Sequence, residues 1–459
     1  MNTILNTDSY KASHYRQYPP NTSAISAYVE ARTGGEYDAV LFFGLQMFLK
    51  EYLARPVTLA DIDDAESVLV PHGLPFNRTD WEVLVDEVGG YLPLDIEALP
   101  EGTVAPTGVP LVQIRNTDPR FFWLPTYIET ALLRSVWYPS TVATVSWQVK
   151  QSIAAALEVS AEDWQAILPS RLHDFGARGT AALEQAGIGG LAHLVNFEGT
   201  DTLEALVYGR RFYGIDMAGF SIPAAEHSTM TSWGEAGEEA AYRNMVRQFA
   251  APGKFVAVVS DSYDLFHAVD SLWGDSLKAE VEQSGGTVVV RPDSGDPTTI
   301  PLETIERLGQ AYGFDVNAKG YKVLRPCIRV IQGDGVTPQT IQVILERLLA
   351  KGWSAENLAF GMGAGLLQKV NRDTLRFAMK ANARLASDGI WHPVFKAPKT
   401  DPGKASKKGR QAVVRTGGRL TGVAAESAAG QQNQLRSVWR DGALLIDECF
   451  EDIRARAAA

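Results

Sequence analysis

The sequence predicts an α/β protein whose middle part forms a (β/α) barrel. Seven short apolar or β-favouring stretches recur about every 30 residues, which is the length of a strand, a helix and two loops. Helical patterns fill several of the gaps between these stretches, and strand alternating with helix implies a parallel sheet. Seven or eight such units fit a barrel, and an open doubly wound sheet is the alternative.

Each of the seven stretches ends in a polar or glycine-rich tip. The stretches are 171–175, 194–200, 220–227, 255–261, 287–293, 328–334 and 357–363. Two of the expected strands, at 256–259 and 288–290, are continuously apolar, as expected of strands that are covered on both faces. The active site of a barrel gathers at the carboxyl ends of its strands, so the polar tips predict where the site lies.

Two gaps between the stretches carry helical signals. The first is 235–250, where apolar residues recur at helical spacing in a segment rich in Ala and Glu. The second begins with Thr337 and Pro338, an N-cap followed by proline at the first helical position. An apolar stripe follows, and Gly352 ends the helix.

The two ends of the chain lack this repeat. Residues 1 to about 142 contain β-like pieces at 23–32 and 103–115 and a helical pattern at 125–137. After about residue 373 the sequence returns to β-like and basic loop segments. We therefore predict a barrel catalytic domain at 143–372 and a discontinuous α+β domain formed by 1–142 and 373–459.

Composition and charge exclude several classes of protein. The chain has 459 residues, 45% of them hydrophobic, and a formal net charge of −11, which is typical of a globular protein and argues against nucleic-acid binding. No apolar run has the length that crosses a bilayer, and the N-terminus has no signal-peptide pattern. The isolated Cys327 and Cys449 indicate a reducing compartment. We predict a cytoplasmic protein that does not bind a membrane.

The segment 396–410 departs from the acidic balance, with six basic residues and one acidic residue. A solvated loop explains this charge, and so does a site that anchors a polyanion such as a phosphorylated substrate.

The strand tips carry ionisable residues and glycines. They are Asp174, Arg178, Asp201, Glu226, His227, Asp261, Arg291, Asp293, Asp334 and the glycines at 361, 363 and 365. Helix capping explains any single acidic tip, but seven such tips in a row favour a substrate with hydroxyl groups and phosphates, which carboxylates and arginines bind. A structural and a catalytic or phosphate-accepting role stay open for His227. The glycine run is either a tight turn or a phosphate-binding loop.

Two aromatic residues, Phe175 and Tyr10, are candidates to sandwich a flat ring, with ordinary packing as the alternative. The sequence has no His-x-x-x-His pattern and no cysteine pair, so it does not predict a tight transition-metal site. Mg²⁺ held mostly by the phosphates of a substrate is compatible with it.

The motifs together resemble the nicotinamide phosphoribosyltransferase family of type II phosphoribosyltransferases. The resemblance runs in order from about residue 5 to about 455 and rests on 7–11, 14–22, 172–179, 195–202, 223–229, 260–264, 291–295, 331–335, 366–369 and 406–410. It implies the irregular α/β barrel of that family with an α+β domain, and a homodimer with active sites at the interface. It also implies NAD salvage, in which the phosphoribosyl group of phosphoribosyl pyrophosphate passes to nicotinamide and yields nicotinamide mononucleotide. Mg²⁺ assists, and ATP is an optional co-substrate that phosphorylates a histidine.

The resemblance also implies roles for single residues. The catalytic set is His227, the phosphorylated histidine, with Asp261 and Asp293. The nicotinamide-binding set is Phe175, Asp201, Arg291 and, from the partner subunit, Tyr10. The set for ribose and its phosphate is Asp293, Gly333, Asp334, Gly363, Ala364 and Arg372. The phosphate and pyrophosphate set is Arg32, Arg178, Lys380, Lys396 and Lys404. No side chain is expected to bind Mg²⁺ directly, because the substrate's pyrophosphate holds it.

Two rival activities remain to be distinguished. Nicotinate phosphoribosyltransferase performs the same chemistry on an acid, and the carboxylate of Asp201 would repel nicotinate while accepting a hydrogen bond from an amide. The other rival, from a different class, is a barrel lyase or isomerase that acts on a phosphorylated sugar.

Overall fold

The computed structural model describes residues 2–459, which divide into two compact units. The terminal unit contains residues 2–144, Arg210–Ile215 and Asn371–Ala459, and the barrel unit contains Val145–Gly209 and Asp216–Val370. Each unit is described by itself below. Within residues 2–459, no helix combines the length and the apolarity that crossing a membrane requires.

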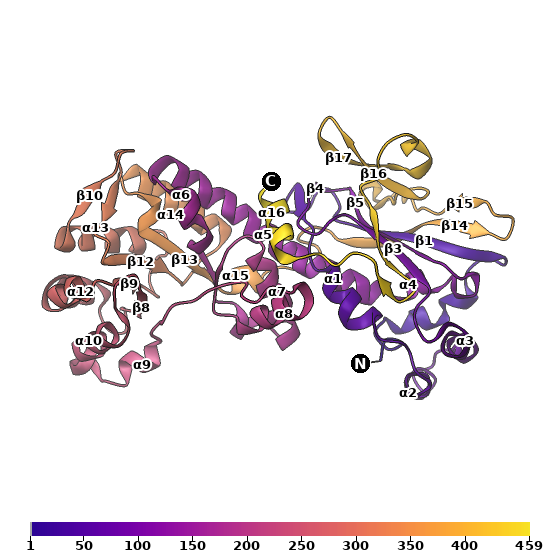
Figure 1. Cartoon of the computed structure of the whole chain (residues 1–459), viewed down its shortest axis with the longest axis horizontal. Coiled ribbons are helices and arrows are strands. Elements are labelled where there is room, and N and C mark those ends of the chain that lie inside the picture. Colours follow the sequence, from indigo (N-terminus) through magenta and orange to yellow (C-terminus); the bar gives the residue numbers. More distant parts are fainter. Residues whose placement is uncertain (1) are drawn as a thin grey trace. The chain divides into compact units, whose positions relative to one another are not determined.

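The terminal unit is built on a seven-stranded antiparallel sheet that draws strands from both ends of the chain. The strand order is β15 (Trp391–Pro393), β14 (Ala378–Ala386), β1 (Thr22–Glu30), β5 (Pro110–Asn116), β3 (Leu94–Ala98), β18 (Arg436–Arg440) and β19 (Ala443–Leu444). Figure 1 shows the early strand β1 beside the late strand β14. The expected sheet formed from N- and C-terminal segments is confirmed.

The terminal unit also contains short helices and two small two-stranded antiparallel sheets. The helices are α1 (Leu45–Phe48), α2 (Leu59–Leu69), α3 (Arg78–Val88), α4 (Leu124–Tyr127) and α16 (Phe450–Ala458), and the long α5 (Glu129–Ser160) starts in this unit. The small sheets pair β2 (Ala39–Leu41) with β4 (Val104–Pro106) and β16 (Gln411–Thr416) with β17 (Arg419–Ala424). Strand β1 is buried along nearly its whole length, and Ala27 and Val29 on one of its faces join the unit's hydrophobic core.

A buried carboxyl group, Glu101, ties three segments of the terminal unit together. Its oxygens accept hydrogen bonds from the backbone N–H groups of Gly44 at 3.1 Å and Gln46 at 2.7 Å, and from the hydroxyl of Tyr213 at 2.7 Å. Burial raises the pKa of Glu101 to about 7, although these hydrogen bonds oppose the shift.

The barrel unit is built on a six-stranded parallel sheet. Its strand order is β7 (Gly199–Thr200), β6 (Leu172–Asp174), β13 (Leu358–Met362), β12 (Ile328–Gln332), β9 (Thr287–Arg291) and β8 (Phe255–Val259). Two isolated parallel bridges, Gly199 with Phe220 and Ala224 with Ala257, join the two edges of this sheet through 220–225. Around the ring the seven segments therefore follow chain order, as in a singly wound barrel and unlike a doubly wound sheet.

The seven predicted stretches all contribute to this ring, and the expected irregular barrel is confirmed. The stretch at 220–227 does so only through single bridges rather than as a regular strand. Pro223 lies within it and has no N–H group to donate to a ladder. The ring's interior contains Ala257, Val289 and Ile331, with Phe175, Ile222 and Ala359 packed against them.

Helices connect the strands of the barrel unit. They are α6 (Trp164–Ile167), α7 (Leu183–Leu194), α8 (Leu203–Tyr213, whose last four residues belong to the terminal unit), α9 (His227–Thr231), α10 (Glu238–Phe249), α11 (Leu265–His267), α12 (Lys278–Ser284), α13 (Ile300–Tyr312), α14 (Pro338–Ala350) and α15 (Ala364–Leu367). A hairpin pairs β10 (Phe314–Val316) with β11 (Lys322–Leu324). Both predicted helices are present, as α10 and α14. Thr337 caps α14 by accepting from the backbone N–H of Thr340, and Pro338 occupies its first position.

Candidate active site

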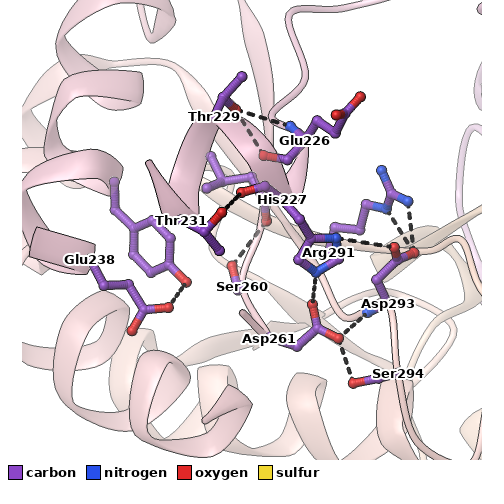
Figure 2. A network of polar contacts seen from close by, with 12 residues as sticks. Glu226, His227, Thr229, Thr231, Glu238, Ser260, Asp261, Arg291, Asp293 and Ser294 are labelled. Atoms are coloured by element: carbon purple, nitrogen blue, oxygen red, sulfur yellow. Dashed lines mark hydrogen bonds and ion pairs between the residues drawn. The ribbon is translucent and has the colours of Figure 1, made fainter. Parts of the chain in front are cut away.

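His227 lies between two carboxylates that follow different strands. It opens α9 directly after the N-cap Glu226, and Figure 2 shows its ring facing Asp261 and Asp293. The distance from Nε2 to Asp261 Oδ1 is 3.0 Å, and that from Nδ1 to Asp293 Oδ2 is 3.8 Å. The side chain of His227 is 44% exposed and that of Asp261 only 3%, so the imidazole faces solvent while its partner is enclosed.

Asp261 is held from several sides at once. Its Oδ2 accepts from the backbone N–H of Asp293 at 3.1 Å and from the hydroxyl of Ser294, while Oδ1 faces His227. The preceding residue, Ser260, donates its N–H to the carbonyl of Arg291 at 3.0 Å. The ends of β8 and β9 are therefore locked together, and this fixes the carboxylate that orients the imidazole.

Arg291, at the end of β9, links this cluster to an aromatic ring. Its Nη2 lies 2.7 Å from Asp293 Oδ1, and its guanidinium carbon lies 5.6 Å from the centre of the Phe175 ring. Gly333 passes close to the same guanidinium, since a Cβ there would lie 3.1 Å from Arg291 Nε. The backbone of the loop after β12 thus approaches a pair of fixed charges.

Phe175 follows β6 and is placed by the carboxyl end of β13. Its N–H donates to the carbonyl of Met362 at 3.0 Å. A Cβ on Gly361 would lie 1.9 Å from Phe175 Cε2, so the ring packs directly on the backbone of Gly361. A Cβ on Gly363 would meet nothing closer than the carbonyl oxygen of Phe175 at 3.4 Å. The half-buried ring is therefore supported on one side by Gly361.

Asp201 follows β7 and is exposed. Its Oδ1 accepts from the hydroxyl of Ser221 at 2.5 Å, and its N–H donates to the carbonyl of Asp174 at 3.0 Å. The second carboxylate oxygen has no bond to Ser221 and can accept from an amide group of a ligand.

The remaining predicted residues of the barrel unit lie at strand ends but are exposed. Asp334 follows β12, and its carbonyl accepts from Gln332 Nε2 at 2.7 Å. Ala364 is the first residue of α15, and Arg178 lies in a short turn after β6. Within this unit the structure joins Phe175, Arg291, Asp293, Asp261 and His227 into one chain of contacts.

The other predicted residues belong to the terminal unit. Lys380, on β14, has its Nζ 3.7 Å from Glu129, which also pairs with Lys11. Burial lowers the pKa of Lys380, and the cations Arg32, Lys11 and Lys396 lower it further while Glu129 opposes them. The structure therefore brings Arg32, Lys380 and Lys396 within electrostatic reach of one another.

Arg32 is largely enclosed, with 13% of its side chain exposed. Its Nε and Nη2 groups are buried with no hydrogen-bond partner, and Nε lies 3.6 Å from Glu30 Oε1. Unsatisfied buried donors on a guanidinium are costly, and an anionic oxygen is the natural acceptor for them.

Three predicted residues of the terminal unit are exposed. Lys404 pairs with Asp401 at 3.1 Å, Arg372 lies 3.5 Å from Asp373, and the side chain of Tyr10 is 55% exposed. Sequence reasoning missed Lys11 and Glu129 as members of the cationic cluster. Lys11 does lie in the N-terminal motif 7–11 that carries the family resemblance, and that motif was the signal that could have identified it.

The side chains of the barrel unit offer few ligands to Mg²⁺. Within residues 2–459, no group of three or more His, Cys, Asp or Glu side chains is arranged to hold a metal ion. Both oxygens of Asp261 are occupied by protein partners, which leaves Asp293 as the carboxylate of the cluster nearest to solvent. One or two carboxylate oxygens are what Mg²⁺ uses when substrate phosphates supply other ligands.

Comparison with known proteins decides the family. Residues 2–96 match the model of the nicotinamide phosphoribosyltransferase N-terminal domain, and residues 170–443 match that of the nicotinate phosphoribosyltransferase (NAPRTase) family. A nicotinamide phosphoribosyltransferase of Xanthomonas campestris pv. campestris is 54% identical over 466 residues, covering 100% of this chain and 98% of the relative. This chain belongs to the nicotinamide phosphoribosyltransferase family. The resemblance read from its motifs is confirmed.

A more distant relative agrees with the family assignment, and a solved structure agrees with the fold. The nicotinamide phosphoribosyltransferase of Acinetobacter baylyi is 32% identical over 495 residues, covering 100% of this chain and 97% of that protein. The crystal structure of nicotinate-nucleotide pyrophosphorylase from Pyrococcus furiosus matches with a TM-score of 0.63 at 15% identity, covering 100% of this chain and 95% of that one. At that identity the structural match supports the fold alone.

Proposed function

We propose that this chain transfers the phosphoribosyl group of phosphoribosyl pyrophosphate to nicotinamide, forming nicotinamide mononucleotide and pyrophosphate in NAD salvage. Family membership confirms the predicted enzyme class, a pentosyltransferase. The observation that carries the proposal is the chain of contacts from Phe175 through Arg291 and Asp293 to Asp261 and His227, which combines a ring platform with charged groups.

The reaction needs positioning more than acid–base chemistry. The pyridine nitrogen carries a free lone pair and forms the new bond to the anomeric carbon, while the bond from that carbon to the pyrophosphate oxygen breaks. No strong base is required. We propose that Phe175 and Tyr10 of the partner subunit stack on the two faces of the nicotinamide ring. Asp201 accepts a hydrogen bond from the carboxamide N–H, and Arg291 makes the other polar contact with nicotinamide.

The phosphates and the ribose are assigned to the other predicted residues. Ribose hydroxyls donate hydrogen bonds to Asp293 and Asp334 beside the backbone of Gly333. Gly363, Ala364 and Arg372 bind the 5′-phosphate. The leaving pyrophosphate is bound by the cations, which are Arg32, Arg178, Lys380, Lys396 and Lys404. The unsatisfied buried donors of Arg32 support this assignment. Mg²⁺ held by the pyrophosphate and at most one or two carboxylates supplies further stabilisation of the leaving charge.

His227 is proposed as the acceptor of the γ-phosphoryl group of ATP. Asp261 accepts a hydrogen bond from the Nε2–H group, which leaves the lone pair of Nδ1 as the nucleophile. The N–P bond forms as the bond between the γ-phosphorus and ADP breaks. The phosphohistidine then adds negative charge and acceptor oxygens near the bound phosphates.

Assembly, domain limits and location are also proposals. We propose a homodimer, supported by the exposure of Tyr10 and by large exposed apolar side chains of the barrel unit, among them Leu203 (75%) and Phe220 (61%). We retain 143–372 as the catalytic domain and 1–142 with 373–459 as the second domain. A cytoplasmic location stays a prediction from the sequence.

The test is a direct assay with both bases. The purified chain is incubated with phosphoribosyl pyrophosphate, Mg²⁺ and either nicotinamide or nicotinate, and the mononucleotide product is quantified by chromatography. We expect nicotinamide mononucleotide as the main product of the wild-type protein. The Phe175→Ala variant serves as a control and is expected to form less of it. Absence of product overturns the proposal, and a preference for nicotinate replaces it with the acid-specific rival.

A further inference from the structure

Asp174 is a charged residue enclosed at the end of β6 that the proposed chemistry does not use. Its exposed fraction is 0%. Oδ1 accepts from the backbone N–H of Gly176 at 2.7 Å, and Oδ2 accepts from the hydroxyl of Thr202 at 2.7 Å. A buried carboxylate is costly unless both of its oxygens are bonded, and both are bonded here.

The two partners of this carboxylate belong to two different turns. Gly176 follows the ring-bearing Phe175, and Thr202 follows Asp201, which is proposed to accept from the carboxamide. The backbone adds a third link, since the N–H of Asp201 donates to the carbonyl of Asp174 at 3.0 Å. One residue therefore connects the turn that carries the stacking ring to the turn that carries the amide acceptor.

The carboxylate also fits its enclosure closely. A Cβ on Gly176 would lie 3.0 Å from Oδ1, and a Cβ on Gly190 would lie 3.2 Å from Oδ2. Burial raises the pKa of Asp174 to about 6, and the hydrogen bonds from Thr202 and Gly176 oppose that shift. The surroundings therefore leave the carboxylate little freedom to move away from its two partners.

We propose that Asp174 is a positioning residue that sets the separation between Phe175 and Asp201 and thereby determines the affinity for nicotinamide. The inference rests on the proposed function, because that function gives Phe175 and Asp201 their roles. Asp174 touches neither substrate and acts through the two turns. A residue that served stability alone would affect both substrates equally when replaced.

The primary test measures KM for each substrate separately. Asp174→Ala removes both side-chain bonds and is expected to raise KM for nicotinamide about tenfold while KM for phosphoribosyl pyrophosphate stays within about twofold. Asp174→Asn is expected to keep KM for nicotinamide close to the wild-type value, because the amide oxygen can accept from the N–H of Gly176 and the NH₂ group can donate to Thr202 Oγ1.

Thr202 provides a milder variant in case Asp174→Ala fails to fold. Thr202→Val keeps the shape but loses the hydroxyl, so it is expected to raise KM for nicotinamide by a smaller factor, and Thr202→Ser is expected to restore it. The matched control is Asn357→Ala, because Asn357 is equally buried and bonds to Leu324, Lys322 and Ser354 at the opposite end of β13. Asn357→Ala is expected to lower Tm without raising KM for nicotinamide relative to KM for phosphoribosyl pyrophosphate.

The outcomes distinguish this inference from the proposed function. If the wild-type protein forms no nicotinamide mononucleotide, the proposed function fails. If the wild type is active but Asp174→Ala and Thr202→Val leave KM for nicotinamide unchanged, or raise both KM values equally, Asp174 has no positioning role. A rise confined to nicotinamide, reversed by Asp174→Asn and Thr202→Ser, supports it.

Discussion

Replacing Gly361 with alanine is expected to displace the ring of Phe175. The substitution adds one methyl group on β13, where the backbone does not require glycine for its conformation. The new Cβ would lie 1.9 Å from Phe175 Cε2, whereas carbon atoms in contact lie about 3.5 Å apart. The ring must therefore move by about 1.5 Å or more.

A displacement of this size is enough to impair stacking on a flat base. An aromatic pair contributes about 0.5–1.5 kcal/mol beyond its buried area, so its loss corresponds to a change of up to about tenfold in affinity. We therefore expect Gly361→Ala to raise KM for nicotinamide by up to about tenfold. KM for phosphoribosyl pyrophosphate is expected to change less, because the added Cβ at position 361 meets the ring of Phe175 rather than Gly363 or Ala364.

A double-mutant cycle with Phe175→Ala separates the clash from other effects of the methyl group. The two single variants, the double variant and the wild type are compared by steady-state kinetics for nicotinamide. In the Phe175→Ala background there is no ring to displace, so adding Gly361→Ala should not raise KM for nicotinamide further. An equal rise in KM in both backgrounds would refute the reasoning.

Three further predictions concern other groups. Asp201→Asn is expected to lower kcat/KM for nicotinamide about tenfold and to admit nicotinate, and an unchanged preference between the two bases would contradict the role of the carboxylate. His227→Ala is expected to abolish any stimulation by ATP, measured as the ratio of rates with and without ATP, and equal stimulation of both proteins would exclude this histidine as the acceptor. The folded pKa of Glu101 lies above its unfolded value, so its contribution to stability is full below pH 4.5 and is lost as the pH rises to about 7, by about 3 kcal/mol at most. Between pH 5 and 8, the free energy of unfolding measured by chemical denaturation should fall less for Glu101→Gln than for the wild type. Equal falls in the two proteins would contradict the raised pKa of Glu101.

The barrel could be predicted because its signals are local. Each strand is a short apolar run with a polar tip, and the order around the ring is the order along the chain. The exception is 220–225, where Pro223 interrupts the ladder and only single bridges remain. Asp174 was placed correctly at a strand end, but its burial depends on Thr202 and Gly190, which only the folded ring brings to it.

The terminal unit was less predictable because its contacts are distant in sequence. The sequence identified β-like pieces at both ends but not the order of the strands, which is set by packing across the sheet rather than by local propensity. The pair between Lys11 and Glu129 spans 118 positions, and no spacing rule connects them. The family resemblance named Arg32, Lys380 and Lys396 together, but the places of Lys11 and Glu129 beside Lys380 emerged only from the structure.

The pairing of β1 with β14 also affects when this protein can fold. The hydroxyl of Ser23 donates to the carbonyl of Ala386, 363 positions further along the chain, so a central strand of the sheet has no partner on one side until almost all of the polypeptide has left the ribosome. Contacts between residues so far apart in sequence form slowly, and the unpaired edge of β1 is prone to aggregation until β14 pairs with it. Truncation before β14 would leave that edge permanently open, so a nonsense mutation that ends the chain just before residue 378 should yield insoluble protein.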